Sequence, residues 1–263
     1  MPSTLSELWR RRHLLWVLTI SNIKRTNKHS ALGWLWWLLD PILLGTVYFL
    51  LASFLFVLRG NQPFALYLII GLVSFKAFAE AVVQSASVIR GRTAIVRAVA
   101  FPKIVLPLSL VFSSTFFFLF SFVAVALLAC WYGPDYGTWP NVYYALLPAV
   151  IGCQLLFTAG VALVAATAGL YFEDTRNIVG HLMRVWYYLS PGLYSLDQIP
   201  ERYHTWFQLN PFTRLMTMYR AIMMKGGAPD LADFAVALVM GVGMCGVGYW
   251  IFRRHEGGFV SEL

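Results

Sequence analysis

The chain has 263 residues, of which 59% are hydrophobic and only 12% charged, and its formal net charge is +8. Soluble domains usually carry about 25% charged residues, so this composition excludes an ordinary soluble protein. Several apolar stretches approach or exceed the roughly 20 residues that a membrane span needs, and no polar block is long enough for a separate folded domain. We therefore expect an all-α integral membrane protein with six transmembrane helices and no large soluble domain.

The first 30 residues are polar and basic, and we expect them to form a cytoplasmic amphipathic helix at the membrane interface. Within 5–25 the apolar residues share one helical face, interrupted by Arg12 and Thr19. Tryptophans on such a face suit headgroup depth. A disordered basic tail is the alternative. The expected apolar face consists of Leu5, Leu8, Trp9, Leu15, Trp16 and Ile23.

Residues 31–263 are expected to form one six-span transmembrane domain. Lys and Arg gather in the N-terminal arm, after the second span, after the fourth span and in the C-terminal tail. This asymmetry follows the positive-inside rule and places both termini in the cytoplasm. The basic charge is thereby explained by topology, and no nucleic acid partner is expected. The expected spans are 33–58, 64–88, 104–131, 143–171, 177–196 and 230–252.

The first span opens with the stretch "GWLWWLLDP", Gly33 to Pro41. Asp40 follows Gly33 by about 10 Å of helix rise, so we expect it at a shallow depth on the cytoplasmic side. Pro41 removes a backbone donor, frees the carbonyl of Trp37 and bends the helix. These features favour the inner entrance of a polar pathway. An interfacial tryptophan belt with an aspartate that reaches water is the alternative.

Two further charges, Lys76 and Glu80, lie inside the second expected span. Charges within the membrane are costly, which makes them candidates for function. Their spacing of four residues puts them on one helical face, where they can form an ion pair. We favour a structural pair that faces the bundle, and a pore-lining pair is the alternative.

After the fifth span the sequence breaks at Pro191-Gly192 and continues through about 30 residues rich in aromatics. Their apolar pieces are too short to cross a bilayer, and irregular backbone at membrane depth must be buried in protein or face water. We expect re-entrant helices that close the outer mouth by packing. Their apolar surface is expected from Tyr194, Ile199, Tyr203, Trp206 and Phe207.

The chain lacks the common catalytic and metal-binding motifs, including HExxH, paired CxxC and the nucleophile elbow. It also lacks a P-loop, so we expect no catalytic residue, no metal site and no cofactor on this chain. Two adjacent carboxylates, Glu173 and Asp174, follow the fourth span. They form either a solvated turn or a docking element.

Several segments appear in a characteristic order: "SALGWLWWLLDPIL", "FPKIVLPLS", "LYFEDTRNIVG", "WYYLSPGLYSLDQIPE" and "NPFTRLMTMYRAI". Together they resemble the permease subunit of bacterial ABC exporters of lipid-linked polysaccharides, which comprise O-antigen, teichoic-acid and capsule exporters. The resemblance covers the chain from about residue 5 to its end. The family often has Asn at Asp40, commonly Arg at Glu173 and usually an aromatic residue near Lys76.

The resemblance implies a homodimer in the bacterial inner membrane, bound to two copies of a cytoplasmic ATPase that carries ATP and Mg. The cargo would be a polysaccharide on an undecaprenyl-type lipid. Matching positions imply ATPase docking by Arg90, Arg92, Arg97, Lys103, Glu173, Asp174, Arg176 and Asn177. They imply an outer gate that includes Pro191, Gly192, Tyr194, Tyr203, Trp206 and Phe207.

A polysaccharide channel needs aromatic faces, because sugar rings present C–H groups that stack on them. We expect the channel lining to draw on Trp34, Trp36, Trp37, Asp40, Lys76, Glu80, Phe117, Trp186, Tyr187 and Tyr188. The expected function is export of an O-antigen-like glycan, with teichoic-acid or capsule export as the alternative. An ion-coupled secondary transporter or a membrane-embedded glycan-modifying enzyme would be a different class.

Overall fold

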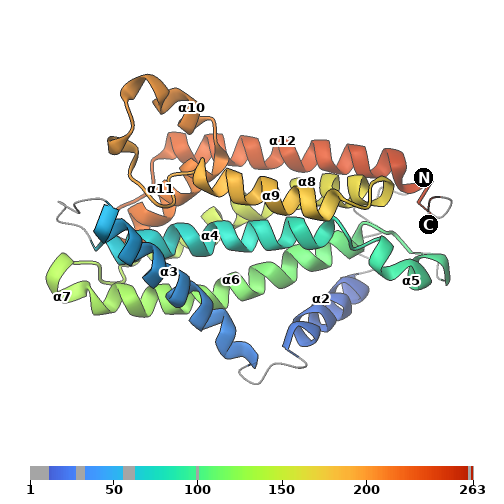
Figure 1. The fold of residues 1–263 in the computed structure, drawn as a ribbon, viewed down its shortest axis with the longest axis horizontal. Coiled ribbons are helices and arrows are strands. Elements are labelled where there is room, and N and C mark those ends of the chain that lie inside the picture. Colours follow the sequence, from blue (N-terminus) through green and yellow to red (C-terminus); the bar gives the residue numbers. More distant parts are fainter. Residues whose placement is uncertain (1–11, 28–32, 56–62, 99–100, 260–261, 263) are drawn as a thin grey trace.

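The computed structural model describes residues 12–27, 33–55, 63–98, 101–259 and 262 (Figure 1). Within these ranges the regular structure is helical. The long helices run side by side, and α3 (Trp36–Leu55) crosses them obliquely. The parallel set comprises α4 (Phe64–Ser85), α6 (Val105–Trp131), α8 (Leu147–Tyr171), α9 (Thr175–Tyr188) and α12 (Leu231–Glu256).

Short elements lie at the two ends of this bundle (Figure 1). One end, here the α5 end, holds α5 (Thr93–Ala98), the turn between α8 and α9, and the last turn of α12. The opposite end, here the α7 end, holds α7 (Gly133–Tyr136) and α10 (His204–Gln208). From the α7 end α11 (Pro211–Met223) returns into the bundle beside α4.

The N-terminal helix α2 (Arg12–Asn27) lies against α6. Leu15 and Leu18 pack on the apolar cluster at the start of α6, and the side-chain amide of Asn22 donates to Ser109 Oγ at 3.0 Å. Trp16 is 64% exposed and points away from α6. A helix is therefore present where we expected one, but its packed face includes polar groups and leaves out Trp16. Residues 1–11 of the expected helix lie outside the described residues.

Four described segments are long and apolar enough to cross a membrane: Phe64–Ser85, Val105–Trp131, Val142–Tyr171 and Leu231–Glu256. Their ends agree closely with four of the six expected spans. The fifth expected span, 177–196, was too long, because α9 ends at Tyr188. Its 14 residues rise about 21 Å, which is short of the roughly 30 Å hydrocarbon core. The helix stops there because Pro191 and Gly192 follow.

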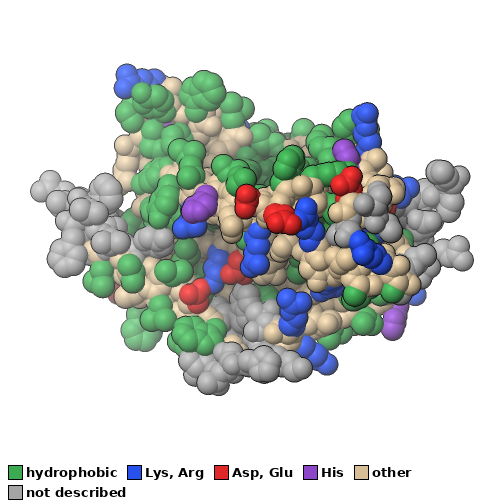
Figure 2. All heavy atoms as spheres, turned by 45° about the vertical axis from the view of Figure 1, so that its right-hand side comes forward, with side chains coloured by type: hydrophobic (Ala, Val, Ile, Leu, Met, Phe, Trp, Pro, Cys, Tyr) green, Lys and Arg blue, Asp and Glu red, His purple; other side chains and the backbone are tan. Residues whose placement is uncertain are grey.

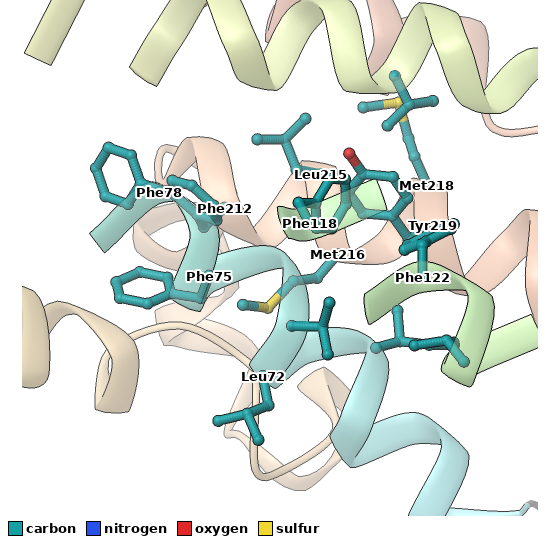
Figure 3. Close-up of a cluster of buried hydrophobic side chains, with 14 of the residues drawn as sticks. Leu72, Phe75, Phe78, Phe118, Phe122, Phe212, Leu215, Met216, Met218 and Tyr219 are labelled. Carbon is teal, nitrogen blue, oxygen red and sulfur yellow. The ribbon is translucent and has the colours of Figure 1, made fainter. Parts of the chain in front are cut away.

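The core is built where α4, α6 and α11 meet, and Figure 3 shows their side chains converging. Phe212 of α11 lies 4.5 Å from Phe78 and 4.9 Å from Phe75 between ring centroids. Tyr219, one of the largest fully buried side chains, contacts Phe122 at 5.5 Å. The aromatic side chains of α11 therefore fix this short helix between two long ones.

The pair α8 and α12 is held by glycines that bring two backbones into contact. A Cβ on Gly248 would lie 2.2 Å from the carbonyl oxygen of Gly160, and a Cβ on Gly160 would lie 2.3 Å from that of Met244. Small residues are how membrane helices approach closely, because van der Waals contact replaces the hydrophobic effect as the attraction between them. On its other faces α12 exposes Val239, Val242 and Trp250, as a lipid-facing helix does.

This contact predicts that Gly248→Val separates α8 from α12 and lowers the free energy of unfolding by about 1–3 kcal/mol, the usual cost of overpacking. Gly246→Val is the matched control, because a Cβ at Gly246 meets nothing within 4 Å. Thermal unfolding of both variants in detergent tests this. Equal melting temperatures would contradict a backbone contact at Gly248.

Candidate functional site

A cavity of about 700 Å³ opens between α3, α4 and α9. This volume lies within the range of sites that bind small molecules. Figure 2 shows acidic and basic side chains close together across the middle of one face, among apolar side chains. The charged and aromatic groups that line the cavity are Trp36, Asp40, Phe75, Lys76, Glu80, Arg176, Arg184, Tyr187 and Tyr188.

Three charged side chains form what we call the charge triad: Asp40, Lys76 and Glu80. The ammonium of Lys76 contacts a carboxylate oxygen of Asp40 and lies 3.6 Å from Glu80 Oε1. Their side chains are 37%, 25% and 30% exposed, in that order, onto the cavity. The expected pairing of Lys76 with Glu80 is confirmed, and the triad both joins two helices and lines a cavity. The contact with Asp40, 36 residues away in the sequence, was not predicted from the sequence.

The triad forms because α3 and α4 approach closely as antiparallel neighbours. Gly45 of α3 lies against Ile69 of α4, where a Cβ would be 2.6 Å from Ile69 Cγ1. Asp40 lies five residues before Gly45 on α3, and Lys76 lies seven residues after Ile69 on α4, so the antiparallel arrangement brings the two side chains together. Pro41, directly after Asp40, lies inside α3, where it cannot donate a backbone hydrogen bond to the carbonyl of residue 37.

The third wall belongs to α9, whose residues at positions 176, 180 and 184 share one face. Arg176 and Arg184 lie on this wall, and Gly180 between them leaves the space of a side chain open. Arg184 Nη2 lies 3.3 Å from the Nδ1 atom of His181. We expected Arg176 at the ATPase-docking surface, and the structure also places it at the cavity.

The expected channel aromatics separate into different environments. Trp36 and Tyr188 line the cavity with 46% and 53% of their surfaces exposed. Tyr187 lines it as well, largely buried against Phe75. The side chains of Trp34 and Trp37 lie outside the described part of the chain.

Two other expected channel residues do not line this cavity. Trp186 packs in the core, with its ring centroid 5.3 Å from that of Phe78, because it lies on the opposite face of α9 from Arg184. Phe117 is 5% exposed among the helices. Aromatic composition alone cannot separate a channel face from a core face, and a channel-lining role for Trp186 and Phe117 stays a prediction.

Arg220 of α11 holds the chain where α9 ends. Its guanidinium donates to the carbonyl oxygens of Pro191 at 2.7 Å, Gly192 at 3.3 Å and Tyr67 at 3.2 Å. It also lies 3.3 Å from the centroid of the Tyr67 ring, and the residue is only 6% exposed. A buried charge is stable only with such partners. The resemblance placed Arg220 at the end of the expected gate segment, 191–220, but none of these contacts was predicted from the sequence.

Two glycines let the turn after α9 lie against α4. A Cβ on Gly71 would lie 2.8 Å from Arg220 Nη2 and 3.2 Å from the Cα of Gly192. A Cβ on Gly192 would lie 2.7 Å from the ring of Tyr187. Tyr67 completes the contact, since its hydroxyl donates to the carbonyl of Tyr194 at 2.8 Å.

Asn210 ties the start of α11 to the end of α9. Its side-chain oxygen accepts from the backbone N–H of Phe212 at 3.0 Å and from the indole N–H of Trp186 at 3.1 Å. Its amide donates to Ser190 Oγ at 2.8 Å. Asn210 is thus an N-cap that also joins the two short helices.

The aromatic residues of the segment after Pro191 lie in different environments. Trp206 is 73% exposed and Tyr203 is 44% exposed, whereas Phe207 contacts the Tyr194 ring at 6.1 Å. The reason is that α10 has five residues and projects from the bundle, so only one side of it is covered (Figure 1). The core contacts near this segment come from α11 instead. Ile199 lies just before α10 and is half-buried.

The residues expected to dock an ATPase gather at the α5 end. Arg90 donates to the carbonyl of Leu170 at 2.9 Å and pairs with Glu173, which joins the α4–α6 connection to the α8–α9 turn. Arg92 donates to Asn22 of α2, and the backbone N–H of Lys103 donates to Glu256 of α12 at 2.9 Å. The remaining members, Arg97, Asp174 and Asn177, are exposed.

Long apolar helices with exposed hydrophobic side chains surround a cavity lined by charged and aromatic side chains. This combination is typical of a membrane transport protein. Sequence comparison specifies the class. The chain belongs to the ABC-2 type transporter family, whose model matches residues 13–224.

Characterised relatives extend over nearly the whole chain. It is 32% identical over 260 residues to the O-antigen export system permease protein RfbA of Myxococcus xanthus, covering 98% of both chains. It is 28% identical over 252 residues to an O-antigen export system permease protein RfbA of Klebsiella pneumoniae, covering 95% of both. It is 22% identical over 245 residues to the polysialic acid transport protein KpsM of Escherichia coli, covering 91% of this chain and 92% of that one.

The charge triad predicts that Lys76→Met destabilises the protein, because it leaves two carboxylates without their cation. Breaking a fully buried pair costs about 3–5 kcal/mol, and partial exposure lowers the expected loss to about 1–3 kcal/mol. Adding Asp40→Asn should recover part of it. Thermal unfolding of the single and double variants tests this, with exposed Lys24→Met as the control. Purely additive effects would contradict the contact.

Proposed function

We propose that this chain is the permease subunit of an ABC transporter that exports a lipid-linked, O-antigen-like polysaccharide across the bacterial inner membrane. The observation that carries the proposal is the full-length similarity to O-antigen export permeases, in a chain that has a charged and aromatic cavity between its helices. Family membership argues against an ion-coupled transporter or a glycan-modifying enzyme.

The cavity has the chemistry that a glycan needs. Exposed rings of Trp36 and Tyr188 offer faces for sugar C–H groups, and the charge triad offers acceptors and donors for hydroxyl groups. Partial exposure of these groups suits a polymer that must move on. Because the identity to KpsM is lower, a capsule polysaccharide is the alternative cargo, and teichoic acid is a further alternative.

The proposed assembly contains two copies of this chain and two copies of a cytoplasmic ATPase that binds ATP and Mg. The α5 end, with Arg90, Arg97 and Lys103, would face the cytoplasm in agreement with the positive-inside rule. Both termini would then be cytoplasmic, and the cargo would be attached to an undecaprenyl-type lipid. In this assembly α3 and the short α9 serve as spans beside the four long segments.

The α7 end would face outward and carry the gate. The helix break at Pro191 and Gly192, the projecting α10 and the returning α11 support a re-entrant arrangement. In this arrangement the gate stays closed through the hydrogen bonds of Arg220 and Asn210 as well as through packing.

Co-expression with a candidate cytoplasmic ABC ATPase tests the proposal directly. The two proteins should co-purify, and ATP hydrolysis should appear only in the complex and rise with lipid-linked glycan. Cells that lack the chain should accumulate this glycan on the cytoplasmic side. Robust ATP hydrolysis by the isolated chain would contradict the proposal.

A docking role for the α8–α9 turn predicts that Glu173→Arg combined with Asp174→Arg weakens the complex. These side chains are exposed, so membrane insertion should stay normal while ATPase binding falls roughly tenfold, a loss of about 1.4 kcal/mol. Asp135→Arg, exposed on α7 at the opposite end, is the control. Unchanged complex yield and export would identify a solvated turn without a docking role.

A gate held by Arg220 predicts that Arg220→Met loosens the turn after α9. Each buried carbonyl left without a donor costs about 1–3 kcal/mol, so the closed arrangement should lose stability. We expect liposomes with this variant to leak small ions without ATP while the ATPase still binds. Lys24→Met, at an exposed position of α2, is the control. Tight liposomes from a correctly assembled variant would place the gate elsewhere.

A further inference from the structure

The charges in the cavity are divided unequally between its walls. The wall from α3 and α4 carries two carboxylates and one ammonium, because Asp40 and Glu80 both lie beside Lys76. The wall from α9 carries the guanidinium groups of Arg176 and Arg184. The first wall therefore has a formal charge of −1 and the second +2.

The two arginines have no carboxylate partner among the residues that the structure describes. Every carboxylate on the cavity wall belongs to the charge triad, and the nearby Glu173 pairs with Arg90. Arg184 contacts only His181 and the carbonyl of Gly180 within these residues. Cations in membrane helices are rare and face partners, cavities or substrate pathways. Here they face a cavity.

The geometry of the α9 wall suits an oxyanion on an extended ligand. Arg176 and Arg184 are eight residues apart, which is about 12 Å along a helix, with Gly180 leaving room between them. A guanidinium group presents a planar fork of donors that matches carboxylate and phosphate. An extended ligand can therefore meet both arginines along this wall, with Tyr188 one helical turn beyond Arg184.

The charge triad makes this arrangement possible. Without Lys76 the carboxylates of Asp40 and Glu80 would repel an anion held on the opposite wall. Because Lys76 contacts one carboxylate and lies 3.6 Å from the other, it lowers the negative potential that they project into the cavity. The triad thus sets the charge preference of the site, although the anion would contact the arginines on the opposite wall.

We propose that the cavity binds an oxyanion carried on a sugar, a carboxylate or a phosphate, through Arg176 and Arg184, and that the charge triad sets its charge preference. This inference rests on the proposed function and names the substrate class of the same site. The oxyanion belongs either to an acidic sugar of the polymer or to the phosphate that links the polymer to its lipid.

Binding to the full-length chain in phosphatidylcholine nanodiscs tests this inference. The probes are a short oligogalacturonate, a neutral galacto-oligosaccharide of equal length and inorganic diphosphate. We expect the oligogalacturonate to bind about tenfold more tightly than the neutral oligomer at low salt, as a charge-assisted contact would give. The preference should shrink at high salt. Equal binding of both oligomers at every salt concentration would overturn the inference.

Variants of the α9 wall locate the site. Arg176→Gln with Arg184→Gln should remove the preference for the acidic oligomer, whereas Arg202→Gln, exposed at the α7 end, should keep it. Arg176→Lys with Arg184→Lys is a second variant that keeps both positive charges but loses the planar guanidinium groups. It should give an intermediate preference. A wild-type preference in the double Gln variant would overturn the inference.

The charge triad gives a second test with opposite signs. Asp40→Asn removes one negative charge and should strengthen binding of the acidic oligomer. Lys76→Met removes the masking cation and should weaken it. Either change can also weaken binding of the neutral oligomer, because the triad offers hydrogen bonds to hydroxyl groups, but only the acidic oligomer should respond to the two changes with opposite signs. A site that recognises only sugar rings would fail to show these opposite shifts.

Competition identifies the source of the oxyanion. Displacement of oligogalacturonate by diphosphate supports one shared oxyanion site. Binding of diphosphate alone also supports the site and assigns it to the phosphate linkage. Export by the complex is measured separately in cells. If the wild-type protein exports glycan but shows no preference for the acidic oligomer, this inference alone is overturned. If it shows the preference but exports no glycan, the proposed function is overturned.

Discussion

The arrangement of this protein depends on one buried cation. Where α9 stops, the carbonyls of Pro191 and Gly192 have no helical partner, and in a low-dielectric interior such groups need donors. Arg220 supplies them from α11 while its guanidinium stacks on Tyr67 of α4. This single side chain connects three helices and permits one of them to end early. Gly71 leaves the space that it needs, and Gly192 leaves space for the ring of Tyr187.

The early end of α9 in turn shapes the cavity. Because α9 stops at Tyr188, its cavity-facing side is short, and Arg176, Gly180 and Arg184 occupy much of it. The opposite wall is set by Gly45 against Ile69, which brings Asp40 beside Lys76. Close backbone approach on one side and a short helix on the other thus produce a hollow with charges on both walls inside an otherwise apolar bundle.

Local patterns in the sequence predicted much of the fold. The long apolar runs located α4, α6, α8 and α12, and Pro191 with Gly192 located the end of a helix. The pairing of Lys76 with Glu80 followed from helical spacing alone. Contacts between distant segments did not follow: Asp40 meets Lys76 only because two helices approach closely, and Arg220 meets Pro191 only through tertiary packing. Hydrophobicity also did not separate the exposed Trp206 from Trp186, which packs against Phe78, because an aromatic residue is equally hydrophobic whether it faces core, lipid or cavity.

The glycine contact between α8 and α12 has a mechanical consequence. Two helices in backbone contact move as one rigid unit, because closely packed elements transmit a displacement with little deformation. One end of this rigid unit carries the α8–α9 turn and Glu256, which accepts a hydrogen bond from the backbone N–H of Lys103. At its other end Asp233 pairs with Arg214 of α11, the helix that carries Arg220. A displacement at the α5 end can therefore be passed along this pair of helices to α11, the helix that holds the turn after α9.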